Sequence, residues 1–224
     1  MNILFCGDFF PSLRISERIE SGDYHFFDSI KPLTEEADYS IVDFEGPVVE
    51  GNAVPIQKTG PNLRCTSKAM AAVKYAGFNC VSFANNHFRD FGDNGVNQSI
   101  NAANKYGLDY MGGGVTLDDA RKILYTVIKD EKLAVINVCE HEWSIATVGH
   151  GGSNPLDIVD NYHDIQAAKE QAERVIVMIH GGVEHYQLPT PRMQKLYRFF
   201  YRCRCRCCDK LPSALFLRMG NLEQ

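Results

Sequence analysis

The sequence lacks a long apolar run and an excess of basic residues, and each absence excludes a class of protein. No stretch approaches the roughly 20 apolar residues that a membrane-spanning helix requires. The formal net charge is -5, and Lys and Arg never form a run longer than a pair before residue 202, so a nucleic-acid-binding surface is not expected. The first eight residues have no basic segment followed by a long apolar one, and they predict a strand instead of a signal peptide. We therefore expect a cytoplasmic protein with no membrane segment.

The composition is typical of one globular domain. The chain has 224 residues, of which 45% are hydrophobic and 23% charged, and this is enough to bury one large core. Four cysteines are scattered and sit mostly in apolar runs, as reduced core thiols do; they are Cys6, Cys65, Cys80 and Cys139. The other four cysteines gather near the C-terminus, at positions 203, 205, 207 and 208.

Short apolar runs bounded by turn residues predict strands, and most connections between them are long enough for helices. The predicted strands cover residues 2–6, 39–42, 80–84, 108–111, 123–128, 132–138 and 174–179; the predicted helices cover residues 29–37, 67–75, 95–106, 162–173 and 192–201. Helical connections between strands favour a parallel or mixed sheet, and residues 123–138 predict a hairpin. In open α/β sheets, ligands bind at the carboxyl ends of strands.

Four predicted strands end in residues that can bind a metal ion. The residues are Asp8, Asp43 with Glu45, Asn86 with His87, and His180. Each of them alone can equally be a turn, cap or core residue. Asp43 and Glu45 alternate on an extended backbone, so they share a face where two like charges require a cation or a donor nearby. Oxygen and nitrogen donors without thiolates suit Mn, Fe, Zn or Mg, and sites with two such ions serve phosphate-ester hydrolysis.

Two loops are predicted to lie around these strand ends. Residues 48–64 are rich in Gly, Pro and Asn, and within them Lys58 or Arg64 either meets an anionic substrate or, more simply, stays solvated. Residues 140–154 form a second wall. The triple glycine at 112–114 lacks the Gly-Lys-Ser/Thr ending of a phosphate-binding loop, so it predicts a turn into a helix capped by Thr116 or Asp118.

Several motifs together resemble the CapA family of poly-γ-glutamate capsule synthesis proteins. The match covers about residues 1 to 200 in the right order and rests on Gly7-Asp8, Asp43-Phe44-Glu45-Gly46-Pro47, Ala84-Asn85-Asn86-His87 with Asp90-Phe91-Gly92, Gly112-Gly113-Gly114 and His180-Gly181-Gly182-Val183-Glu184-His185. The resemblance implies an α/β fold, the metallophosphoesterase-like layered α/β/β/α sandwich, with a dinuclear site for divalent metal ions at the strand ends.

The resemblance also implies roles for individual residues. Asp8, Glu45, Asn86 and His180 would be metal ligands, His87 the general acid, and Glu184 a further catalytic or substrate-facing group. The residues expected to contact the substrate or support the ligands are Asp43, Asn85, Lys58 and His185. We expect a metal-dependent hydrolase of phosphoester or related bonds in capsule synthesis, acting on an anionic polymer or a small molecule. The alternatives are a non-catalytic accessory protein, which binds its partner through the two loops, and an inactive truncated gene product.

The C-terminal segment departs from the family. We predict a partial domain over residues 1–201 and an aberrant tail over residues 202–224, because alternating Cys and Arg fits no strand or helix pattern. A zinc knuckle needs further ligands that do not follow. Suitable codons read in a shifted frame give Ala-Gly-Ala-Asp-Ala-Val over residues 203–208 and then a His-x-His pair, which is the family pattern. We therefore predict a frameshifted tail without a strand partner, an exposed sheet edge and weakened or absent dinuclear metal binding.

Overall fold

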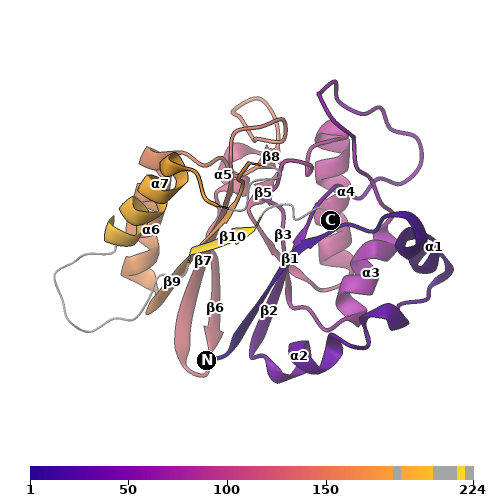
Figure 1. Ribbon diagram of the computed structural model, residues 1–224, viewed down its shortest axis with the longest axis horizontal. Coiled ribbons are helices and arrows are strands. Elements are labelled where there is room, and N and C mark those ends of the chain that lie inside the picture. Colours follow the sequence, from indigo (N-terminus) through magenta and orange to yellow (C-terminus); the bar gives the residue numbers. More distant parts are fainter. Residues whose placement is uncertain (184–187, 204–215, 220–224) are drawn as a thin grey trace.

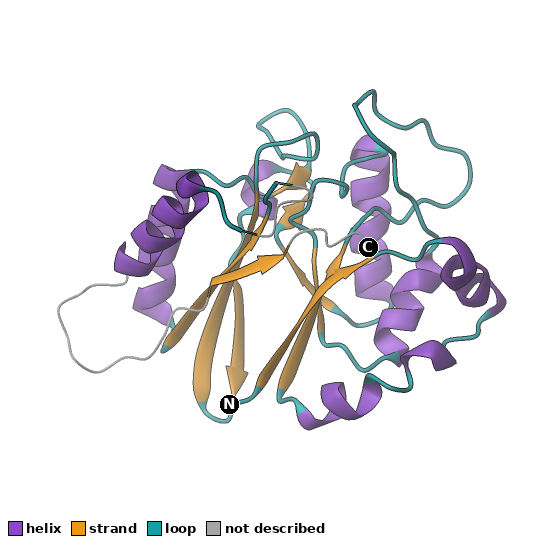
Figure 2. Cartoon of the chain, viewed as in Figure 1, coloured by secondary structure: helices purple, strands orange, loops and turns teal. Residues whose placement is uncertain are grey.

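Two four-stranded sheets face each other between two layers of helices, as Figures 1 and 2 show. In this computed structural model, residues 1–183, 188–203 and 216–219 are described. The first sheet is entirely parallel, in the order β1-β2-β3-β4. Its strands are β1 (Ile3–Phe9), β2 (Tyr39–Phe44), β3 (Cys80–Ser82) and β4 (Asp109–Met111). The predicted α/β/β/α layering is confirmed.

The second sheet is mixed, in the order β10-β9-β7-β6. Its strands are β6 (Leu124–Ile128), β7 (Glu131–Cys139), β9 (Arg174–His180) and β10 (Phe216–Met219). The predicted hairpin is confirmed, since β6 and β7 pair antiparallel around Lys129 and Asp130, which both have positive φ, at 51° and 66°. A short antiparallel pair, β5 (Gly113–Gly114) with β8 (Gly152–Ser153), lies beside the two sheets.

Helices cover the outer face of each sheet (Figure 1). On the first sheet lie α1 (Leu13–Ser21), the short 3-10 helix η1 (His25–Phe27), α2 (Lys31–Glu36), α3 (Ser67–Tyr75) and α4 (Gly92–Lys105). On the second lie α6 (Ile158–Gln171) and α7 (Pro191–Cys203), and the short α5 (Leu117–Ala120) packs against β5 and β8. Thr116 caps α5 by accepting a hydrogen bond from the Asp119 amide, as predicted.

Three apolar clusters fill the three spaces between the four layers. The first lies between the first sheet and its helices and includes Val81, Met70 and Val96. The second lies between the sheets, where Ile41 and Val135 are fully buried. The third, which includes Ile136, Ile165, Ile179, Leu196 and Phe200, joins the second sheet to α6 and α7. The central strands β2, β7 and β9 are buried along most of their length because both of their faces pack against another layer.

Several predicted element boundaries are wrong, and the errors in β1 and β2 bear on the site. β1 and β2 run further than expected, so Asp8 and Asp43 lie inside strands and not after them. A register irregularity between Cys6 and Asp8 makes this continuation possible. Pro32 was expected to interrupt the predicted helix at residues 29–37. It stands instead in the first turn of α2, where its missing N–H costs nothing, so it does not interrupt the helix.

The tail also differs from expectation in the part that the structure describes. α7 continues to Cys203, two residues beyond the predicted domain end. β10 pairs in parallel with β9, from Phe216 opposite Val177 to Met219 opposite His180, so the expectation of a tail without a strand partner is wrong. The shifted-frame stretch at 204–208 lies outside the described residues.

Two further findings concern membranes and thiols. Within the described ranges, no helix combines the length and the apolar character needed to cross a bilayer. The cysteines at positions 6, 65, 80, 139 and 203 are free thiols, and Cys80 and Cys139 are buried.

Candidate metal centre

Three ionisable side chains from the two facing sheets meet at one point. Asp8 on β1 and Asp43 on β2 are cross-strand partners in the first sheet, and His180 is the last residue of β9 in the second sheet. His180 Nδ1 lies 3.5 Å from Asp43 Oδ2 and 3.7 Å from Asp8 Oδ1. One potential ligand atom from each residue lies within 4.8 Å of the other two. This is the spacing of ligands around one cation.

The two carboxylates are in an environment that opposes their ionisation. Asp43 is fully buried, and burial, followed by the charges of Asp8 and Glu45, raises its pKa well above the ordinary range. A hydrogen bond from the Ser82 hydroxyl opposes this shift only in part. Burial likewise raises the pKa of Asp8 to about 6, against a lowering hydrogen bond with Asp43. A bound cation would offset both effects.

His180 is held as a neutral imidazole. Burial, and then the nearby His87, lowers the pKa of His180 to about 4. Its Nε2 lies 3.1 Å from the amide oxygen of Asn86, so Nε2 carries the proton in that hydrogen bond. Nδ1 therefore directs its lone pair toward the two carboxylates, and it makes no hydrogen bond. Neutral imidazole is the form that binds metal ions.

The donor set fits a divalent cation. Asp43 Oδ2 and His180 Nδ1 are both buried and both lack a hydrogen-bond partner. Buried polar atoms without partners are rare and costly, and here they face each other across the space between the sheets. Two carboxylates and one imidazole are ligands of Mn, Fe or Zn.

His87 lies next to this group and belongs to a second polar cluster. Its side chain is 9% exposed, and its Nδ1 is 2.7 Å from Asp90 Oδ2. The Lys58 ammonium forms an ion pair with the other oxygen of Asp90 and lies 3.1 Å from His87 Nδ1. Lys58 is therefore not a solvated surface charge, and that interpretation is wrong: its side chain is only 2% exposed.

The remaining predicted site residues have structural contacts that the sequence did not specify. Asn85 is buried and donates to the Phe44 carbonyl at 2.9 Å, and it accepts from the His87 amide at 3.1 Å. Glu45 is buried beside Asp43. The loop that was predicted over residues 48–64 runs to α3, and we call it the 48–66 loop. Arg64 donates to backbone carbonyls at its start. Glu184 and His185 lie outside the described residues.

Three supporting residues were not predicted. In the sequence analysis, Asp90 was named only as part of the Asp90-Phe91-Gly92 motif. Its position three residues after His87, in a turn, is the signal that could have predicted its contact with the imidazole ring. Ser144 donates to the Asn86 carbonyl at 2.7 Å and accepts from the Arg89 amide at 3.0 Å. Glu140 accepts from the Gly182 amide at 3.1 Å and pairs with Arg192. These long-range partners have no local sequence signal.

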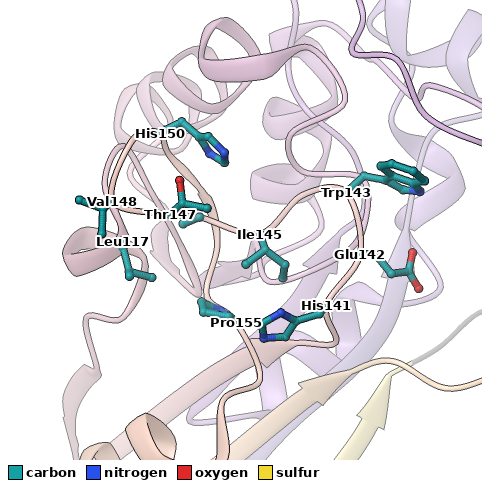
Figure 3. Close-up of a pocket in the computed structure, with 10 residues that line it drawn as sticks. Leu117, His141, Glu142, Trp143, Ile145, Thr147, Val148, His150 and Pro155 are labelled. Atoms are coloured by element: carbon teal, nitrogen blue, oxygen red, sulfur yellow. The ribbon is translucent and has the colours of Figure 1, made fainter.

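A pocket of about 550 Å³ opens in the loop between β7 and α6. Figure 3 shows that most of its lining comes from this one loop, with Leu117 of α5 on one side. The lining residues are Leu117, His141, Glu142, Trp143, Ile145, Ala146, Thr147, Val148, His150 and Pro155. None of Asp8, Asp43 and His180 is among them, so the pocket and the metal-ligand group are separate features.

Comparison with known proteins identifies relatives that act in capsule synthesis. The family model described as bacterial capsule synthesis protein PGA_cap matches residues 2–204. The capsule biosynthesis protein CapA of Bacillus anthracis is 28% identical over 205 residues, which are 88% of this chain and 50% of that protein. The PGA biosynthesis protein CapA of Bacillus subtilis (strain 168) is 26% identical over 198 residues, 87% of this chain and 52% of that protein.

The chain spans about half the length of these curated relatives. Among solved structures, a hypothetical protein from Thermus thermophilus aligns with a TM-score of 0.46 and 13% identity, over 82% of this chain and 59% of that one. A novel phosphatase from Mycoplasma pneumoniae aligns with a TM-score of 0.47 and 15% identity, over 91% of this chain and 59% of that one.

Proposed function

Because this chain belongs to the bacterial capsule synthesis protein family PGA_cap, we propose that it is a divalent-metal-dependent hydrolase acting in capsule synthesis. The bond cleaved is a phosphoester or a related bond of an anionic substrate. One observation carries the proposal: Asp43 Oδ2 and His180 Nδ1 face each other at 3.5 Å, both buried and both without hydrogen bonds.

In this proposal Asp8, Asp43 and His180 hold one cation. Asn86 lies against His180, and Glu45 lies beside Asp43, so these two residues extend the donor set toward a second cation. The chemistry that a divalent cation supplies in such a site is Lewis acidity toward water and toward a phosphoryl oxygen. The fully buried core below Asp43 keeps water away from one side of the group.

His87 acts as the general acid in this proposal. Its Nδ1 is engaged by Asp90, so Nε2 is the nitrogen that can give a proton to the leaving oxygen. His87 directly follows Asn86, which contacts His180 at 3.1 Å. His87 and Asn86 thus lie on one turn after β3, so the distance between the general acid and the Asn86 amide is fixed.

The names of the relatives suggest the polymer. One is a capsule biosynthesis protein and another a PGA biosynthesis protein, and we propose that the substrate here is a phosphorylated precursor of the capsule polymer. A second candidate function is a non-catalytic accessory protein of polymer synthesis. The pocket in the loop between β7 and α6 favours it, because this pocket offers a binding surface apart from the metal-ligand group.

Metal binding and hydrolysis together test the proposal. Wild-type protein, the variant Asp43→Asn and a control, Asp118→Asn at an exposed helix position, are titrated with Mn²⁺ and Zn²⁺ by calorimetry. Wild type and control should bind metal and hydrolyse an aryl phosphoester, and Asp43→Asn should bind metal at least about 100-fold more weakly and lose the hydrolysis. Metal binding without hydrolysis of any phosphoester would favour the accessory function, and no metal binding by the wild type would overturn the metal site.

A further inference from the structure

A buried ion pair joins the 48–66 loop to the general acid. The Lys58 side chain is 2% exposed and the Asp90 side chain is not exposed at all. Lysine is almost never buried without a partner, because removing an ammonium from water is costly. Here the ammonium is paired with Asp90 Oδ1 and also lies 3.1 Å from His87 Nδ1. A lysine with so little contact with solvent has no free face for a substrate.

Asp90 joins the 48–66 loop to the turn that carries His87. Its Oδ2 accepts the Leu63 amide at 2.6 Å and lies 2.7 Å from His87 Nδ1. Its backbone carbonyl accepts the Ile56 amide at 2.9 Å. With Lys58 on Oδ1, the loop is held to Asp90 on both sides of residue 58. The same carboxylate orients the His87 ring, so the contacts that hold the loop against Asp90 also fix the orientation of the ring.

We propose that Lys58 is a positioning residue for hydrolysis: it fixes Asp90 and, through it, the ring of His87, so that Nε2 alone faces the substrate. The inference rests on the proposed function and assigns Lys58 no contact with the substrate. Without the ammonium, Asp90 is a buried carboxylate with one fewer donor. Its Oδ1 then has no donor, so the carboxylate is free to rotate, and Oδ2 no longer holds His87 Nδ1 in one orientation.

Activity measurements on Lys58→Met test this role, with Lys122→Met as the matched control. Lys122 also pairs with an aspartate, Asp119 at 2.6 Å, but its side chain is 76% exposed. We expect Lys58→Met to lower kcat about 10- to 100-fold with KM nearly unchanged, and to lower hydrolysis of an alkyl phosphoester more than that of an aryl one. A poor leaving group needs the acid more. The control should keep wild-type kinetics.

A double-mutant cycle with His87→Ala separates positioning from a general structural effect. If Lys58 acts through His87, Lys58→Met should change the rate less than about twofold once His87 is absent. Equal losses for both substrates with additive effects in the cycle, or a rise in KM alone, would overturn the proposal. The second result would make Lys58 a substrate contact.

A measurement that needs no activity keeps this inference distinct from the proposed function. In wild-type protein, nitrogen NMR should show a slowly exchanging Lys58 ammonium and a His87 Nδ1 in a hydrogen bond. Both signals should persist even if no phosphoester is hydrolysed, while metal binding tests the proposed function separately. If Lys58→Met does not fold, Lys58→Gln, which retains a donor for Asp90, takes its place. A rapidly exchanging ammonium in wild type, or an unchanged His87 ring signal in a folded variant, would overturn the proposal.

Discussion

His180 and Asp43 come from facing sheets, and their Nδ1 and Oδ2 atoms lie 3.5 Å apart with no hydrogen bond to either. The pair therefore costs stability in the metal-free protein and contributes it when a cation is bound. This trade between stability and binding is typical of functional sites. It leads to a test in which one substitution has opposite effects with and without metal.

The variant Asp43→Asn should bind Mn²⁺ at least about 100-fold more weakly than wild type, because it loses a charged ligand. In the absence of metal it should be the more stable protein at pH 7.5. The reason is that the raised pKa of Asp43 makes its ionisation unfavourable in the fold. Thermal unfolding with and without Mn²⁺ measures both effects, and a lower unfolding midpoint for the metal-free variant would contradict this account.

The pH dependence of stability should differ between the metal-free and metal-bound forms. The pKa of Asp8 is raised to about 6, so its contribution to stability is present below pH 4 and is lost as pH rises through 6. The pKa of His180 is lowered to about 4, so its contribution is present above pH 6.5 and is lost as pH falls through 4. Between pH 4 and 6 the folded state holds one extra proton on Asp8 and one fewer on His180, and the two effects cancel.

Metal binding removes that cancellation, because Asp8 must release its proton to become a ligand. Asp43, whose pKa is also raised, must release a proton as well. The affinity for Mn²⁺ should therefore fall by at least about tenfold for each pH unit below 6. Unfolding midpoints from pH 4 to 8, with and without Mn²⁺, test this. The metal-free curve should show little slope from this pair, and a Mn²⁺ effect that is equally large at pH 5 and pH 7 would count against Asp8 as a ligand.

The α/β/β/α layering was implied only by the resemblance to the CapA family, whereas most strands could be predicted because each is a short apolar run followed by polar residues. The same pattern predicted that Asp8 and His180 lie at one edge of the fold. The sequence did not reveal that β1 and β2 continue through Asp8 and Asp43. The irregularity at Cys6 and Asp8 depends on pairing with a neighbouring strand, and such pairing has no local signature.

The Lys58 environment shows the main limit of sequence reasoning. Its partner Asp90 lies 32 residues away along the chain, and an isolated lysine in a Gly- and Pro-rich loop is usually solvated. Only the packing of the 48–66 loop on the Asn86 turn brings the two charges together. The strand β10 is a similar case. Nothing in its residues predicted that it would pair with β9.

The variant His87→Asn tests the assignment of the general acid. It should lower hydrolysis about 100-fold or more and leave Mn²⁺ affinity within about threefold of wild type, because His87 is not among the three ligand candidates. His163→Asn, at an exposed position on α6, is the control. Unchanged hydrolysis in the His87 variant would favour the accessory function.

The variant Gly181→Ala tests how the turn after β9 positions His180. A Cβ at residue 181 would overlap the Glu140 side chain, which holds the Gly182 amide. We expect Mn²⁺ affinity to fall about tenfold and the unfolding midpoint to drop by a few degrees, of the order seen for overpacking. Gly149→Ala, where only Thr147 comes near at 3.9 Å, should change neither quantity.

The number of bound ions tests the frameshift hypothesis for the tail. The family match ends at residue 204, where alternating Cys and Arg replace the expected strand and His-x-His pair. With Asp8, Asp43 and His180 in place but without those imidazoles, this chain should bind one Mn²⁺ tightly. A version with the shifted frame restored from residue 203 should bind two. Two tightly bound ions in the present chain would show that the His-x-His pair is not needed for the second ion. A gene whose other frame encodes no His-x-His would show that no shifted frame supplies the pair. Either result would rule the hypothesis out.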